Sequence, residues 1–263
     1  KTPRPVFVLR RGDVNQPLEA ATPGALACLP GLEAKFALEN ANDEGARRAA
    51  LARWVSDPKN ALTWRSIVNR VWHYHFGRGI VDTPNDFGRM GSPPTHPELL
   101  DWLASWFLEH GGSIKSLDRL IVTSATYRQS SKNNSQYAEI DASNRYLWRM
   151  NRMRLDAEQL RDAALAIAGK LDRTMGGPSV KQFIESPGIH VTVNVDYQNF
   201  DVDSPASFRR SVYRFLFRTL PYPFMDSMDC ADASQLTPTR NASVTALQAL
   251  AMLNNRFIVR QSE

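Results

Sequence analysis

The segment Asn69–Gly88, NRVWHYHFGRGIVDTPNDFG, gathers side chains that bind metals, anions and sugars. On a helix, Arg70 and His73 lie three residues apart and share a face. His73 and His75 are two apart and point in roughly opposite directions, so a bidentate metal site is not expected on a helix. Arg70, His73 and Asp86 are therefore candidate ligand-binding residues. In the structural alternative, which we prefer, the helix end folds back on its own loop and Arg70 pairs with Asp86.

A second group of charged residues lies in RMRLDAEQLRDA, where Arg154, Glu158, Arg161 and Asp162 follow at helical spacing. Glu158 and Arg161 complete the set of candidate ligand-binding residues. Two carboxylates could form an acid–base pair, but flanking arginines lower a carboxyl pKa, which is the wrong direction for a general acid. The pattern favours an ion-pair ladder along the helix. The opposite face is apolar: Leu160, Ala164 and Ile167.

The two cysteines, Cys28 and Cys230, are far apart in the sequence and lack the spacing of zinc or haem motifs. Cys230 lies between two aspartates, and neighbouring anions raise a thiol pKa, which argues against a catalytic nucleophile. No dinucleotide, zinc-protease or nucleophile-elbow motif is present. We predict no cofactor and no metal in this segment. We also predict no membrane span, because no apolar run is long enough.

The chain has 263 residues, of which 43% are hydrophobic, and a formal net charge of +5. Its 32 basic residues are spread along the chain among acidic ones instead of forming a stripe, so nucleic-acid binding is not expected. The six tryptophans lie mostly on predicted helices, where packing is the default role and sugar stacking the alternative. The chain starts at Lys1 without a methionine, which we interpret as a fragment of a larger multidomain protein.

The elements that position these side chains are predominantly helical. Hydrophobic periodicity predicts helices over 42–55, 60–76, 116–128, 154–171 and 243–259. Gly77 ends the second of these helices. Thr95 and Glu98 predict a capping box for a further helix, which the pair Gly111-Gly112 ends. Strands are predicted over 6–9, 190–197 and 209–218, with the first paired to the third. The fold class is mainly α, a single helical domain over 1–263 with a small antiparallel β-sheet and a β-rich segment at about 176–220.

Several long segments, in this order, resemble one family, the C-terminal domain of unknown function (domain of unknown function 1553, planctomycete surface domain) of large planctomycete proteins. The resemblance covers nearly the whole chain. The segments are VLRRGDVNQP, NRVWHYHFGRGIVDTPNDFGRMGSPPTHPELLDWLA, LDRLIVTSATYRQSS, NRYLWRMNRMRLDAEQLRDA, RRSVYRFLFRTLP and RNASVTALQALAMLNNRF.

The resemblance implies a module of an exported protein, periplasmic or in the cell envelope, with a cytochrome c-like domain among its neighbours. It supplies no catalytic residues. Three functions stay open: a binding or scaffold module for neighbouring domains of the same polypeptide or for carbohydrate; a polysaccharide-active enzyme with Glu158 or Asp86 as acid or base; and a docking surface for a cytochrome domain in electron transfer. Evenly spread arginines paired with acids favour the first.

Overall fold

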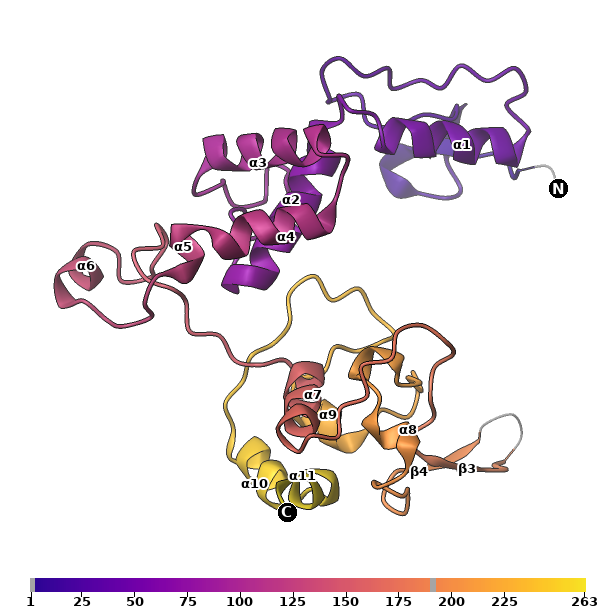
Figure 1. Ribbon diagram of the computed structural model, residues 1–263. Coiled ribbons are helices and arrows are strands. Elements are labelled where there is room, and N and C mark those ends of the chain that lie inside the picture. The colour runs from indigo at the N-terminus through magenta and orange to yellow at the C-terminus, as the bar shows by residue number, and fades with distance from the viewer. Residues whose placement is uncertain (1–2, 190–192) are drawn as a thin grey trace. The chain divides into compact units, whose positions relative to one another are not determined.

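The computed structural model describes residues 3–189 and 193–263 (Figure 1). Within them it contains eleven α-helices and two small antiparallel sheets, so the mainly α fold class is confirmed. The chain divides into two compact units, Lys1–Arg152 and Met153–Glu263, and each is described by itself below. The sequence predicts that these two units form a single domain, and this stays a prediction.

The N-terminal unit begins with a hairpin. Strand β1 (Phe7–Leu9) pairs antiparallel with β2 (Pro17–Ala20), and the 3-10 turn η1 (Arg10–Gly12) lies between them. Arg11 and Gly12 both have positive φ angles, 52° and 79°, which bend the chain back at once. The predicted pairing of the first strand with residues 211–217 is wrong, because a local partner only a turn away satisfies the backbone of β1.

Three predicted helices of the N-terminal unit are present. Helix α1 is Glu44–Val55 and α2 is Ala61–Phe76, and the side chains of Asp43 and Asn60 accept hydrogen bonds from their first-turn amides. Helix α3 is Pro97–Glu109, but its N-cap is His96 without a side-chain cap. The Thr95 capping box is therefore wrong. The Thr95 hydroxyl donates instead to the carbonyl of Ile80 at 3.3 Å.

The segment predicted as one helix over 116–128 is two helices, α4 (Ile114–Thr123) and α5 (Ala125–Arg128). Ser124 is extended, and its hydroxyl caps the second of them. A further short helix, α6 (Ser135–Ile140), follows, and Asn134 is its N-cap.

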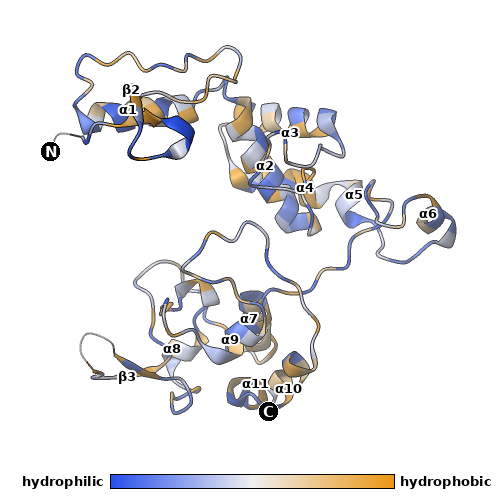
Figure 2. Ribbon diagram, turned by 180° about the vertical axis from the view of Figure 1, so that it is seen from behind, coloured by the Kyte–Doolittle hydropathy of each residue, from blue (hydrophilic) through white to orange (hydrophobic). Residues whose placement is uncertain are grey.

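The core of the N-terminal unit lies among α2, α3, α4 and the loop after α2. Figure 2 shows orange and blue residues alternating along these helices, as expected where one face is buried. The burial of these side chains fixes α2 and therefore the loop that follows it. The buried apolar residues are Val68, Trp72, Phe76, Ile80, Val81, Leu100, Leu103, Phe107, Leu117 and Ile121.

The C-terminal unit contains α7 (Ala157–Ile167), β3 (Ile184–Ser186), β4 (Asn194–Asp196), α8 (Pro205–Phe208), η2 (Ser211–Tyr213), α9 (Pro223–Ser227), α10 (Ala246–Asn254) and α11 (Arg256–Ser262). Strands β3 and β4 pair antiparallel within the predicted β-rich segment. Part of the strand predicted over 190–197, residues 190–192, lies outside the described residues. Helix α7 is shorter than the predicted 154–171.

Two other predictions for the C-terminal unit are wrong. Residues 209–218 form no strand, and their only regular element is the 3-10 turn η2. The segment forms two isolated parallel bridges, Arg209 with Asp172 and Arg214 with Val180, so its β-prone side chains lack a partner strand. Residues 243–259 are two helices instead of one, because the extended Asn255 separates α10 from α11 and its side chain caps the second.

Candidate functional site

Helix α7 carries most of the charged side chains that could form a site in the C-terminal unit. Its buried residues are Ala157, Arg161 and Leu165, four apart. The apolar stripe predicted through Ile167 is wrong, because Ile167 is 88% exposed. An arginine instead lies at the centre of the buried face, so α7 packs around a charge and each donor of that charge needs a partner.

Arg161 is 2% exposed and its guanidinium is well supplied with partners. Its Nη1 donates to the carbonyl of Arg209 at 3.0 Å, and its Nη2 donates to the carbonyl of Ser207. Burial and the nearby cation Arg214 lower the pKa of Arg161 to about 10, so it stays protonated at neutral pH. These contacts fix the segment after α8 against α7, which is a structural role.

Glu158 forms the second charged contact of α7. Arg240 donates to both of its carboxylate oxygens, with Nη2 at 3.0 Å from Oε1. Burial raises the pKa of Glu158, but the hydrogen bonds and charge of Arg240 outweigh it and leave that pKa below its ordinary value. This carboxylate is therefore held ionised, as the flanking arginines predicted, although the arginine responsible comes from 82 residues away.

The thiol of Cys230 lies beside this pair and donates to Glu158 Oε1 at 3.7 Å. Burial, followed by the charge of Glu158, raises the pKa of Cys230 to about 11. The predicted direction is confirmed, but its main cause is burial and not the flanking aspartates. Both cysteines are free, and Cys28 is exposed. A thiol with this pKa is almost wholly protonated at neutral pH, which removes its nucleophilic form.

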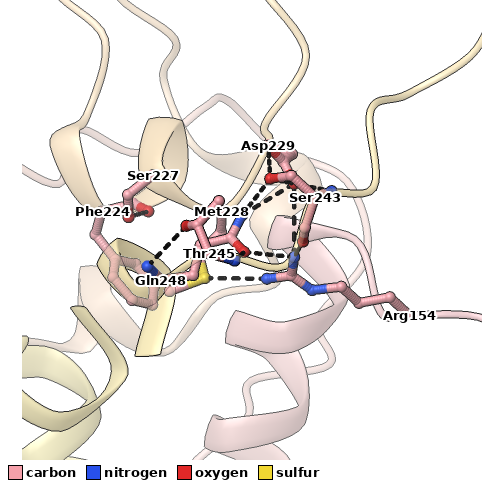
Figure 3. A network of polar contacts seen from close by, with 8 residues as sticks. All are labelled: Arg154, Phe224, Ser227, Met228, Asp229, Ser243, Thr245 and Gln248. Carbon is pink, nitrogen blue, oxygen red and sulfur yellow. Dashed lines mark hydrogen bonds and ion pairs between the residues drawn. The ribbon is translucent and has the colours of Figure 1, made fainter. Parts of the chain in front are cut away.

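Arg154 belongs to a further network of hydrogen bonds and ion pairs, drawn in Figure 3. Its guanidinium donates to Gln248 Oε1 at 2.9 Å and lies 3.5 Å from Asp229 Oδ2. Asp229 also accepts from the amide of Ser243 at 2.8 Å and from its hydroxyl, and these bonds lower the pKa of Asp229. Gln248 belongs to the capping box of α10 with Thr245. The network therefore anchors the N-terminus of α10.

The ion-pair ladder predicted along α7 is consequently wrong in its partners. Arg154 pairs with Asp229 and Glu158 with Arg240, while Asp162 accepts from the amide and hydroxyl of Ser211. One contact is along the helix, between Arg161 and Asp162 at 3.4 Å. The charges of α7 thus hold distant segments of the C-terminal unit, and local helical spacing does not predict those partners.

Arg214 differs from these arginines. It is 7% exposed, and its backbone is fixed because Val180 bonds the residues on either side of it. Its Nε donates to Gln182 Oε1 at 3.0 Å, and its guanidinium lies over the ring of Tyr222, 5.2 Å from the centroid. Among the residues that the structure describes, none accepts a hydrogen bond from its two terminal nitrogens. None of the ion pairs among the described residues includes Arg214; burial lowers its pKa, and the charge of Glu158 opposes that shift.

Arg214 also lines two cavities of the C-terminal unit. The larger, about 710 Å³, is lined by charged groups of α7 and by Arg240. The smaller, about 290 Å³, is lined mainly by aromatic side chains and the segment 230–234. Its guanidinium thus lies at a wall that the two cavities share, and its terminal nitrogens have no acceptor among the described residues. This arrangement is suited to holding an anion.

The candidate residues of Asn69–Gly88 belong to the N-terminal unit, and none of them is among the residues lining the two cavities. The predicted ion pair of Arg70 and Asp86 is wrong: Arg70 donates to Asn85 Oδ1, and Asp86 Oδ1 accepts from the amide of Gly88 at 2.8 Å. The ring of His73 meets that of Tyr74 edge to face. A ligand-binding role for these three residues stays a prediction.

The helix end does fold back on its own loop, as predicted, but another residue holds it there. Asn69 is fully buried; its Nδ2 donates to the carbonyl of Val81 at 2.9 Å and its Oδ1 accepts from the amide of Val81 at 2.8 Å. Gly77, with a φ of 75°, ends α2 in the left-handed conformation. An asparagine on the buried face of an amphipathic helix was the signal that could have identified this contact.

Sequence reasoning missed Arg240 and Arg214. Arg240 lies in a Pro/Ser/Thr-rich stretch with no periodicity, and Arg214 lay within a segment predicted as a strand. The described residues contain no group of three or more histidine, cysteine or acidic side chains placed to hold a metal. No helix in the described ranges is both long and apolar enough to cross a membrane.

Fold and cavities together define a mainly helical module with charged internal contacts. Residues 47–263 match the PSD1 family, protein of unknown function (DUF1553), and the chain belongs to that family. The resemblance noted in the sequence is thereby confirmed at the level of the family. Neither the curated proteins nor the solved structures include a match to this chain.

Proposed function

We propose that this chain is a binding module, and that it binds a small anionic ligand in the C-terminal unit. One observation carries the proposal: Arg214 is a buried guanidinium at the wall of two cavities, and its terminal nitrogens have no acceptor among the described residues. These terminal nitrogens are not among the enclosed side-chain atoms that lack a hydrogen-bond partner, so they are accessible to a ligand. A bound anion would supply the acceptor that the protein does not.

The chemistry of the neighbouring groups supports binding over acid–base catalysis. Glu158 is held ionised by two bonds from Arg240, so it lacks the raised pKa of a general acid. Asp86, the other carboxylate considered for an enzyme, caps its own loop through Gly88. The thiol of Cys230 has a pKa raised to about 11, which disfavours the thiolate. The charged groups around the cavities are therefore suited to binding a ligand and not to proton transfer.

The family resemblance adds a setting to this proposal. The module would act in an exported protein, in the periplasm or cell envelope, beside a cytochrome c-like domain and other neighbouring domains of the same polypeptide. Binding of carbohydrate and docking of a cytochrome are the partner functions to test in that setting. An acidic sugar would unite the carbohydrate prediction with the anion proposed for Arg214.

The proposal is tested by thermal unfolding of the chain with acetate, phosphate, sulfate and glucuronate. A ligand present at 100 times its Kd stabilises the folded state by about 2.7 kcal/mol, which is a shift of several degrees. We expect at least one of these anions to raise the melting temperature, and Arg214→Met to abolish the shift. The control is Arg173→Met, at an exposed arginine that lines neither cavity, and it should keep most of the shift. Equal shifts in wild type and Arg214→Met, or no shift with any anion, would overturn the proposal.

A further inference from the structure

The smaller cavity of the C-terminal unit has the features of a site for a flat or ring-shaped molecule. Its volume, about 290 Å³, is near the lower limit of small-molecule pockets, about 300 Å³. Four aromatic residues line it together with two arginines and two aspartates. These residues are Tyr197, Phe215, Phe217, Tyr222, Arg214, Arg218, Asp226 and Asp232.

The aromatic rings lining this cavity form one connected cluster. The rings of Tyr197 and Tyr222 lie 4.8 Å apart at 30°, and those of Phe215 and Phe217 lie 6.1 Å apart. Phe183 is buried and contacts three of them edge to face. This cluster supplies flat apolar walls, and the contacts with Phe183 fix the positions of the rings, which favours stacking with a ligand ring.

The charged groups of the cavity favour a single carboxylate. A guanidinium presents donors in a planar fork that matches both oxygens of a carboxylate. Glu158 of α7 already accepts two bonds from Arg240, and it acts on Arg214 through its charge alone, without a hydrogen bond. Asp226 and Asp232 line the same cavity and would repel a second negative charge on the ligand.

We infer that the smaller cavity binds a six-membered ring bearing one carboxylate, with the carboxylate on Arg214 and the ring against the aromatic cluster that includes Tyr222. This inference rests on the proposed function and names its ligand class. Two kinds of ligand have a six-membered ring and one carboxylate: an aromatic acid such as benzoate, and a uronic acid such as glucuronate. Sugar rings and aromatic rings both stack on aromatic side chains, so the cavity fits both kinds, and the experiment decides between them.

The test is calorimetric titration of the whole chain with benzoate and glucuronate, alongside three comparison ligands. Benzamide keeps the ring without the charge, acetate keeps the charge without the ring, and phthalate adds a second carboxylate. We expect benzoate or glucuronate to bind at least tenfold more tightly than each comparison ligand. Whichever of the two binds more tightly identifies the source.

Three variants connect this binding to the cavity. Arg214→Met should weaken binding at least tenfold, and Tyr222→Leu about fivefold, in keeping with one stacking contact. The control Arg173→Met, at an exposed arginine that lines neither cavity, should weaken it less than threefold. Far-UV circular dichroism verifies that each variant folds, and Tyr222→Leu decides the result if Arg214→Met does not fold. If the Tyr222→Leu variant binds the ring acids as tightly as wild type does, the inference is overturned.

The two proposals fail in different ways. If acetate and phosphate bind as tightly as the ring acids, and Arg214→Met abolishes all of this binding, the anion site stands and the ring inference is overturned. If no anion binds at all, both are overturned. Tighter binding of phthalate than of benzoate would refute the argument that the two aspartates exclude a second charge.

Discussion

Replacing Asn69 by alanine should destabilise the N-terminal unit more than any change at the charged residues around it. The side chain of Asn69 is fully buried on α2, and it bonds both the amide and the carbonyl of Val81. These two bonds attach the loop after α2 to the helix itself. The alanine variant removes both partners and leaves the backbone of Val81, which is also buried, without acceptor or donor.

The magnitude follows from the two groups left unsatisfied. Each buried polar group without a partner costs about 1–3 kcal/mol. The small cavity left by the amide adds to this sum, so we expect a loss of about 3–5 kcal/mol. Whole domains are stable by about 5–15 kcal/mol, so such a loss would remove a large part of the unit's stability.

Urea unfolding followed by tryptophan fluorescence measures this loss directly. All six tryptophans lie between residues 54 and 148, so the signal reports the N-terminal unit alone. Arg70→Ala is the matched control, because Arg70 is the adjacent residue and its contact to Asn85 is exposed. It should cost less than about 1 kcal/mol. If Arg70→Ala costs more than Asn69→Ala, our account of how this loop is held is refuted.

Four further outcomes are expected. Gly79→Ala should destabilise the N-terminal unit by more than about 1 kcal/mol, because its Cβ would lie 2.8 Å from Asn69 Nδ2 and closer still to a backbone oxygen; urea unfolding measures this. Arg161→Met should cost about 3 kcal/mol in thermal unfolding, since it leaves buried carbonyls without donors, whereas a near-neutral result would contradict its structural role. Folding lowers the pKa of Glu158, so this carboxylate contributes fully to the stability of the folded state above its ordinary pKa of 4.5, and the contribution is lost as the pH falls through the folded pKa. In thermal unfolding, Glu158→Gln should therefore lose less stability than wild type between about pH 5 and 3. Iodoacetamide at pH 8 should modify only the exposed Cys28 in the folded chain, and rapid modification of Cys230 would contradict its raised pKa.

Local patterns predicted the helices of the N-terminal unit well. The apolar spacing of 60–76 and the glycine after it are properties of the helix itself, and α2 begins and ends as they indicate. The fold-back of the loop was also predictable, since a left-handed Gly77 must turn the chain. The residue that holds the loop to the helix was not predictable from the sequence. Asp86 looked suitable, but it accepts a hydrogen bond from its own neighbour Gly88.

The partners of the α7 charges could not be read from the sequence. Glu158 could be seen to need a cation, but helical spacing offered Arg154 and Arg161, and tertiary packing uses both elsewhere. The segment 209–218 was misread for a related reason. Its β-branched and aromatic content indicates a strand only where a neighbouring strand is present, and Val180 supplies a single bridge. Arg214, one of the residues that line both cavities, was thereby assigned to a sheet.

The shared wall at Arg214 has a thermodynamic consequence for the two cavities. An anion in the smaller cavity would neutralise the guanidinium, and the larger cavity would then lose a positive charge from its lining. A second anion would bind there less tightly, and by linkage the first would be weakened by the same factor. Two anions would therefore behave as antagonists without sharing a contact with each other. A single arginine could in this way make the occupancy of one cavity depend on the occupancy of the other.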